Sequence, residues 1–282
     1  MKIRINDQNY SATINTLGAE LESFYKDDIN YIWNIDEQYW NKTSPVLFPI
    51  VGRLKNDRYT LNGKVYSLPR HGFARNFEFT IVEKTNNSVV FSLKSNEETL
   101  KVYPFEFELL LQYNLNQNRL KIGYKVINLS NQKMPFNIGA HPAFSIPSSF
   151  DEYSLQFNEN ESFKTHHLEN ELFNGKNSLV ESFNNSIQLK YSLFEKDALV
   201  FKNLQSTTVS ILKNNKTHIT INYDSFPFLG IWTKVNAPFL CIEPWTGHAD
   251  YDNTNGEIYE KKSIQVLNPK TTFECSFSIE IA

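Results

Sequence analysis

Titratable side chains occur at four places where the neighbouring residues are apolar or are glycine and proline. They are Arg53, His71, His141 and Glu243, within the segments 48–58, 68–75, 137–144 and 240–250. Such surroundings favour a half-buried site over a solvated surface. Two imidazoles, a guanidinium and a carboxylate together suit proton transfer at a neutral substrate rich in oxygen atoms. The four residues therefore form the first candidate site.

Each candidate also has a purely structural explanation. Arg53 and Arg75 fit surface cations, His71 fits a turn histidine, and His141 fits a core histidine bonded to a backbone carbonyl. Glu243 is harder to explain in this way. An ionised carboxylate in an apolar run costs several kcal/mol unless it is paired or reaches a cleft. Glu243 is therefore the strongest single candidate.

Other familiar site patterns are missing from the chain. No His-x-His or Cys-x-x-Cys spacing supports a zinc site. Neither a G-x-S-x-G elbow nor a glycine-rich phosphate loop occurs. We therefore expect no metal and no cofactor.

The elements that must position these residues are predicted to be strands. Positions 105, 107, 109, 111 and 113 are apolar or aromatic, and most of the residues between them are polar. The alternation resumes over 120–126 after a polar turn at 116–118, which predicts an antiparallel hairpin. Asn62-Gly63 predicts a second hairpin with a type I′ turn. Similar alternation covers 219–223 and 273–281.

Helical signals are weak. Only 36–40 and 192–197 suggest single turns, and 158–185 is the most loop-like region. Aromatic residues make up 14% of the chain, which favours strands because their side chains suit a pleated, half-buried surface. No linker divides the sequence. We predict an all-β fold, a large antiparallel β-sandwich, as a single domain over 1–282.

Composition excludes several classes of partner. The net charge is −3 with no basic block, which argues against nucleic acid. Two cysteines are too few for a disulfide framework and indicate buried thiols in a reducing compartment. Residues 1–6 resemble a strand rather than a signal peptide, and no run of 18 apolar residues exists. We expect a cytoplasmic protein without a membrane partner, as a monomer or homodimer.

At these segments the chain resembles the aldose 1-epimerase (galactose mutarotase) family. The greater likeness is to its LacX-like branch, found beside sugar-utilisation genes in Gram-positive bacteria. The likeness runs from 15–21 to the C-terminal strand and includes, in order, the motifs at 51–53, 70–75, 139–144, 228–232 and 241–245. It implies a β-supersandwich with an open concave cleft.

The resemblance also implies roles for the four residues. Glu243 matches the general base, His141 the general acid, and His71 and Arg53 the pair that orients substrate. The implied reaction interconverts the α and β anomers of a hexose such as galactose or glucose without a cofactor. Mutarotases typically read Asn-His-x-Tyr-Phe, whereas this chain has Ala-His-Pro-Ala-Phe at 140–144. The sequence therefore does not determine which aldose is the substrate.

Further residues fit a sugar site in this framework. Trp232 and Trp245 suit stacking on the apolar face of a sugar ring, and core packing explains either equally well. Better-known galactose mutarotases carry an additional aspartate that grips sugar hydroxyls. Asp250 and Asp224 are the two candidates for it in this sequence.

Three alternatives stay open. Arg75, with Arg70 or Lys55 nearby, suits a phosphate, so the substrate could be a hexose 6-phosphate. A glycoside hydrolase would need a second carboxylate beside Glu243 and would leave the histidines without a role. A non-catalytic carbohydrate-binding protein would need neither Glu243 nor His141.

Overall fold

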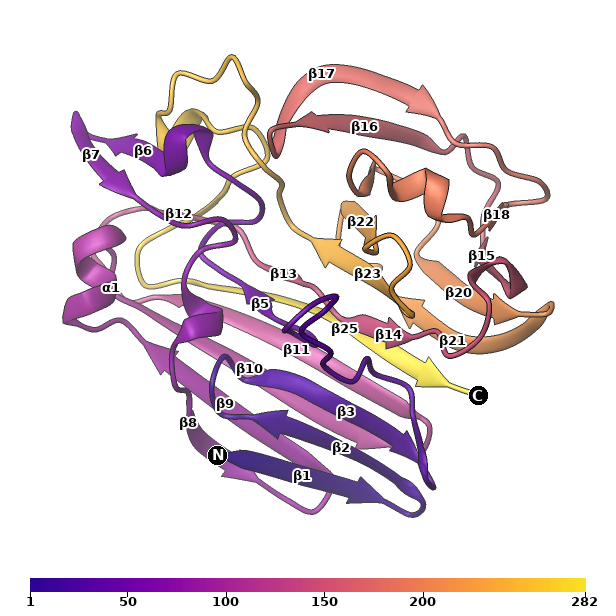
Figure 1. The fold of residues 1–282 in the computed structure, drawn as a ribbon. Coiled ribbons are helices and arrows are strands. Elements are labelled where there is room, and N and C mark those ends of the chain that lie inside the picture. The colour runs from indigo at the N-terminus through magenta and orange to yellow at the C-terminus, as the bar shows by residue number, and fades with distance from the viewer.

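The computed structural model describes all residues, 1–282, and is built almost entirely of antiparallel strands. Figure 1 shows the largest sheet running beneath a smaller one, with hairpins above both. The predicted all-β, sandwich-like class is confirmed. No helix is both long enough and apolar enough to cross a membrane. The single-domain organisation stays a prediction.

Nine strands form the largest sheet. Their order is β18 (Ser186–Gln188), β15 (Tyr153–Phe157), β20 (Thr208–Lys213), β21 (Lys216–Asn222), β25 (Thr272–Ile281), β11 (Arg119–Asn128), β10 (Phe107–Asn116), β9 (Ser88–Lys94) and β8 (Thr80–Lys84). The predicted hairpin is β10 and β11, paired from Phe107 with Asn128 to Asn116 with Arg119. Alternate residues of β10 are buried, as the sequence pattern predicts.

A smaller sheet carries most of the candidate residues. It consists of β19 (Leu199–Lys202), β22 (Phe228–Trp232), β23 (Phe239–Trp245), β13 (Gly139–Ala140) and β5 (Val46–Leu47), with β14 (Ala143–Ser145) also paired to β23. Every residue of β23 is buried. The strand therefore reads as a continuous apolar run in which Glu243 is the exception.

The remaining strands form four further groups. A four-stranded sheet contains β1 (Lys2–Asp7), β2 (Tyr10–Asn15), β3 (Glu20–Lys26) and β4 (Ile29–Asn30). Three pairs are β6 (Arg58–Leu61) with β7 (Lys64–Ser67), β12 (Met134–Phe136) with β24 (Gln265–Leu267), and β16 (Lys164–Glu169) with β17 (Leu172–Leu179). The β6–β7 turn has positive φ at Asn62 and Gly63, as a type I′ turn requires.

Helical structure is short and differs from expectation. One α-helix, α1 (Glu97–Val102), was not predicted, although Asn96 caps it by accepting hydrogen bonds from two amides of the first turn. The 3₁₀ turns are η1 (Lys55–Asp57), η2 (Ala74–Asn76), η3 (Phe150–Glu152), η4 (Tyr191–Phe194) and η5 (Ile258–Glu260). Residues 36–40 form a turn and no helix.

The region 158–185 corrects the prediction of a loop. It contains the hairpin β16–β17, which Figure 1 shows above β22 and β23. The hairpin is tied to the smaller sheet because the Thr165 hydroxyl accepts a hydrogen bond from Val200 N of β19 at 3.0 Å. Its strands lack clear alternation since β17 is mostly exposed. This hairpin proves important for the site.

Candidate active site

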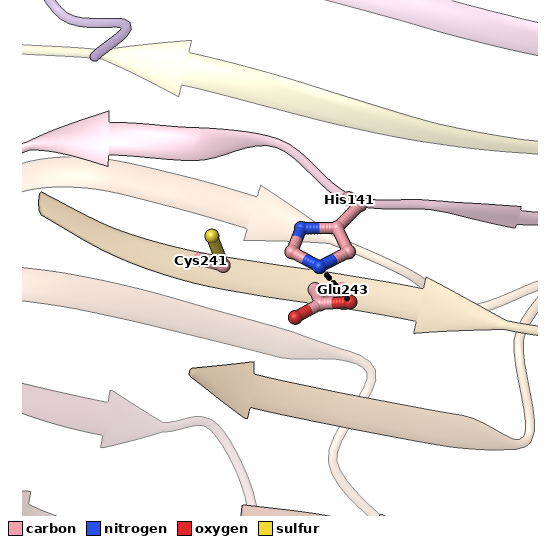
Figure 2. A group of neighbouring side chains, drawn as sticks. All are labelled: His141, Cys241 and Glu243. Atoms are coloured by element: carbon pink, nitrogen blue, oxygen red, sulfur yellow. Dashed lines mark ion pairs between the residues drawn. The ribbon is translucent and has the colours of Figure 1, made fainter. Parts of the chain in front are cut away.

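Strand register brings His141 and Glu243 together. Gly139 pairs with Trp245 and Ala143 pairs with Cys241, so His141 lies directly opposite Glu243 on β23. His141 Nε2 is 3.2 Å from Glu243 Oε2. Figure 2 shows the imidazole pointing toward the carboxylate of the neighbouring strand. Two residues about one hundred positions apart thus form one buried acid–base pair.

These two side chains have few other polar contacts. His141 Nδ1 and Glu243 Oε2 are buried and form no hydrogen bond within the protein. The imidazole is held instead by aromatic rings. Trp40 stacks on it with ring centroids 4.9 Å apart, and Trp232 and His71 approach it edge-on at 5.9 and 5.8 Å. Aromatic packing therefore positions the imidazole, and these two polar atoms have no hydrogen-bond partner within the protein.

Burial governs the protonation of the pair. It raises the pKa of Glu243 well above its usual range, an effect that Arg70 opposes and Asp197 reinforces. Burial and the charge of Arg70 lower the pKa of His141 to about 3. Desolvation disfavours both charged forms, so the unliganded pair carries one proton, held by the carboxyl group. A transfer over 3.2 Å converts this form into carboxylate and imidazolium.

His71 is fixed by a reciprocal backbone contact. Its N–H donates to the Gly52 carbonyl at 2.8 Å, and Gly52 N–H donates to His71 Nδ1 at 3.1 Å. If Nδ1 keeps this contact, the ring proton lies on Nε2, which can donate to a substrate oxygen. Arg70 Nε also approaches Nε2 at 3.1 Å. A neutral imidazole cannot accept at both nitrogens, so this contact must yield when Nε2 donates.

The turn at His71 has little freedom. Its φ is +67°, a left-handed conformation that is uncommon for a residue other than glycine. A Cβ on the following Gly72 would come within 2.2 Å of the Phe48 carbonyl oxygen. Arg75 braces the same turn by donating from Nη2 to the Arg70 carbonyl at 2.7 Å. Such local strain is characteristic of functional sites.

An ion-pair cluster lies at the cavity. Arg53 binds Asp57 through two hydrogen bonds of 2.8 Å and binds Glu171 through a third of 2.8 Å. Arg70 pairs with the other oxygen of Glu171. Glu171 is in the turn of the β16–β17 hairpin, where its φ is +65°. The hairpin is thus held against the cavity by one carboxylate between two guanidinium groups.

Fifteen residues line the cavity at this site. Six are candidates from the sequence: Arg53, His71, His141, Trp232, Glu243 and Trp245.

Sequence reasoning missed Asp197, Glu171 and Trp40. Asp197 lines the cavity from the segment before β19, and burial raises its pKa. It lies beside Ala198 and Val200, which also line the cavity, but a single aspartate after Glu195-Lys196 gave no distinctive pattern. Glu171 lies in the region predicted to be a loop. Trp40 lies in the turn after Asp36, where only its aromatic character was available as a signal.

The two tryptophans differ in their packing. Trp245 fits between glycines, since a Cβ at Gly139 or Gly230 would come within 2.7 or 2.4 Å of the indole. It is therefore both a core residue and part of the cavity wall. Trp232 packs edge-on against Trp40 with ring centroids 5.7 Å apart and also borders the cavity.

The structure places two predicted contact residues outside the cavity lining. Asp250 is buried and accepts hydrogen bonds from Lys261 Nζ at 2.8 Å and Lys55 N at 2.9 Å. Arg75 contacts the Arg70 backbone instead. Asp224, the other aspartate considered, is exposed in the turn after β21. Asp197 is the aspartate at the cavity.

Fold and site together describe a mutarotase-type protein, and the chain belongs to the aldose 1-epimerase family, whose model matches residues 1–265. The plasmid and chromosomal forms of protein LacX from Lactococcus lactis subsp. lactis are each 35% identical to it, over 100% of this chain and 99% of the relative. The resemblance noted from the sequence is therefore confirmed.

Solved structures agree with this assignment. A galactose mutarotase related enzyme from Lactobacillus acidophilus superimposes with a TM-score of 0.96 at 34% identity, covering 100% of this chain and 97% of that one. A galactose mutarotase-like protein from Lactobacillus casei gives 0.95 at 30% identity, with 100% of both chains covered. Galactose 1-epimerase from Lactobacillus acidophilus, at 14% identity, shares the fold with a TM-score of 0.74, over 100% of this chain and 94% of that one.

Proposed function

We propose that this protein is an aldose 1-epimerase that interconverts the α and β anomers of a hexose such as galactose or glucose. The observation that carries the proposal is the buried pair of His141 and Glu243, 3.2 Å apart at the cavity. Anomer exchange needs one group to take a proton and another to give one, and this pair supplies both. A cytoplasmic location, expected from the unpaired cysteines, belongs to the same proposal.

Ring opening follows from the pair's geometry. Hydroxyl groups of the bound sugar donate hydrogen bonds to Glu243, which favours its charged form and moves the shared proton to His141. Glu243 then takes the proton of the C1 hydroxyl, the C1–O5 bond breaks, and O5 receives the proton of His141. The open-chain aldehyde remains beside a neutral pair, which is the form that burial favours.

Ring closure reverses these transfers. Rotation about C1–C2 presents the other face of the carbonyl group, and His141 then takes the O5 proton as O5 attacks C1. Glu243 returns its proton to the C1 oxygen. The Nε2–H of His71 and the Arg70 guanidinium are placed to stabilise negative charge that develops on the sugar oxygens. No co-reactant is consumed in the cycle.

Polarimetry tests this proposal. Freshly dissolved α-D-galactose or α-D-glucose should approach equilibrium rotation faster with the protein than without it. Glu243→Gln should remove the acceleration, since it removes the proton acceptor, a loss of about 10²–10⁴-fold. Sugar binding, measured by calorimetry, should persist in the variant. No acceleration on any free or phosphorylated hexose would refute the proposed activity.

Two observations support alternative substrates or reactions. Arg53 and Arg70 converge on one carboxylate at the cavity, an arrangement that also suits a phosphate group, so hexose 6-phosphates belong in the assay. Asp197 and Glu243 both line the cavity, and two carboxylates are the usual requirement of glycoside hydrolysis. Release of the chromophore from a nitrophenyl glycoside would favour hydrolysis. Binding without turnover would favour a carbohydrate-binding protein.

A further inference from the structure

Cys241 lies beside the acid–base pair and is not needed by the proposed mechanism. It precedes Glu243 by two positions on β23, so both side chains project from the same face of the strand. Figure 2 shows its sulfur close to the imidazole of His141. The ligand atoms of His141, Cys241 and Glu243 lie within 4.8 Å of one another, and all three residues are buried.

The donor atoms in this cluster are available for coordination. Cys241 is a free thiol, and Glu243 Oε2 forms no hydrogen bond within the protein. Imidazole, thiolate and carboxylate are the ligands of Zn²⁺, which often takes three from the protein and leaves a fourth position open. Mg²⁺ and Ca²⁺ prefer sets of six or more oxygens, which this cluster cannot supply.

The charges balance on binding. A thiolate and a carboxylate carry two negative charges, so a divalent ion bound by Cys241, Glu243 and neutral His141 forms a neutral complex. Neutrality matters because all three side chains are buried, where an uncompensated charge is costly. The thiol proton and the proton shared by the pair are released to solvent. Zinc–ligand bonds of about 2.0–2.3 Å require the three atoms to converge by roughly 1 Å.

We propose that His141, Cys241 and Glu243 form a binding site for a thiophilic divalent cation such as Zn²⁺ or Cd²⁺, and that the bound ion blocks the acid–base pair. Only the blocking effect rests on the proposed epimerase function. Sequence spacing gave no sign of this site because strand pairing, not local spacing, brings His141 to the other two ligands.

Cd²⁺ titration of the full-length protein tests binding directly. Cd²⁺–thiolate bonds absorb in the ultraviolet by charge transfer, which reports coordination by sulfur without any sugar. Cys275 is the matched control, since it is the other buried free cysteine and lies on β25. The wild type and Cys275→Ser should develop the band at one ion per chain. Cys241→Ser should lose the band and at least about tenfold in affinity.

Three results would each overturn the metal site. The wild type could show no charge-transfer band, Cys241→Ser could show the same band as the wild type, or Mg²⁺ could bind the wild type as tightly as Cd²⁺ does. If Cys241→Ser fails to fold, Glu243→Gln carries the test because it keeps the thiol and removes one anionic ligand. Its Cd²⁺ affinity should fall at least about tenfold, and an unchanged affinity would count against the site.

Inhibition is measured separately by polarimetry. Zn²⁺ should slow anomer exchange by the wild type, with recovery on chelation, whereas Cys241→Ser should stay active and insensitive to the ion. Full activity with the site saturated would overturn the blocking effect. If the wild type shows no mutarotation at all, the proposed function fails while the Cd²⁺ titration still decides the metal site.

Discussion

His141 faces Glu243 across adjacent antiparallel segments, with 3.2 Å between Nε2 and Oε2 and no hydrogen bond from the protein to the other imidazole nitrogen. Burial shifts the two pKa values in opposite directions, downward for His141 and upward for Glu243. The pair therefore holds a single proton over a wide range of pH. Ring opening only moves that proton, together with one from the sugar, among three oxygen atoms and one nitrogen atom.

The pH dependence of catalysis should accordingly be flat. A second proton is gained only as the pH falls toward about 3, the pKa of His141, and the single proton is lost only above the raised pKa of Glu243. We expect kcat/KM to change less than about threefold between about pH 5 and 8. Polarimetry in buffers of constant ionic strength measures it. A change in kcat/KM with a midpoint near pH 6.5, which is typical of an unperturbed histidine, would contradict the proposal that His141 and Glu243 hold a single proton between them.

Trp40 should control the orientation of His141. Its ring stacks on the imidazole at 4.9 Å and 29°, so it fixes the ring and stabilises the imidazolium form. Trp40→Ala should lower kcat about tenfold with little change in KM, while Trp40→Phe should retain most activity. Ile35→Ala, an exposed change in the same loop, is the control.

The alternating strands could be predicted from sequence because their periodicity follows from local geometry. The β10–β11 hairpin and the β6–β7 turn illustrate this, since alternation fixes a face and Asn62-Gly63 fixes a turn. The β16–β17 hairpin could not be predicted in the same way. Most of β17 is exposed, so no apolar face marked it.

The residues of the candidate site also differ in how well the sequence predicts them. Glu243 and His141 could be predicted because titratable groups in apolar surroundings are informative individually, and a family motif joined them. Asp197 and Glu171 come from polar segments where a carboxylate is unremarkable. Their importance depends on which segments the sheet edges bring to the cavity, a long-range property that local spacing does not contain. Asp250 pairs with the buried Lys261 and lies outside the cavity lining, and the spacing of the two residues in the sequence did not indicate this pairing.

Asp197 should bind a sugar hydroxyl as an acceptor. It is the aspartate at the cavity, and its charge contributes to the raised pKa of Glu243. Asp197→Asn should raise KM about tenfold, as expected for loss of a hydrogen bond to a charged group, and change kcat less. Asp224→Asn is the matched control, because Asp224 is exposed in a turn away from the cavity. A larger effect of the Asp224 change would reverse this assignment.

Glu171 should compete with anionic ligands for Arg53 and Arg70. Glu171→Gln keeps the size of the side chain but leaves Arg70 without its carboxylate partner and frees Nη1 of Arg53, which stays paired with Asp57. Inorganic phosphate and hexose 6-phosphates should then bind about tenfold more tightly, with free hexoses little affected. Glu169→Gln, an exposed change on the same hairpin, is the control. Inhibition constants for phosphate test this prediction. Equal constants in Glu171→Gln and Glu169→Gln would show that Glu171 does not compete with phosphate.

Glu243→Gln should stabilise the protein at pH 8 and have almost no effect at pH 4. Burial raises the folded pKa of Glu243 above its ordinary value of 4.5. The folded chain therefore retains a proton that the unfolded chain releases above about pH 4.5, so the stability contributed by this group falls as the pH rises from there toward the folded pKa. Glutamine has the same shape and no such dependence. Calorimetry should show a higher Tm in the variant than in the wild type at pH 8, with a difference that grows as the pH rises from 4 to 8. The control is Glu274→Gln, a change at an exposed position. If Glu243→Gln changes Tm by the same amount at pH 4 and pH 8, then packing, rather than the ionisation of Glu243, determines the effect of this residue on stability.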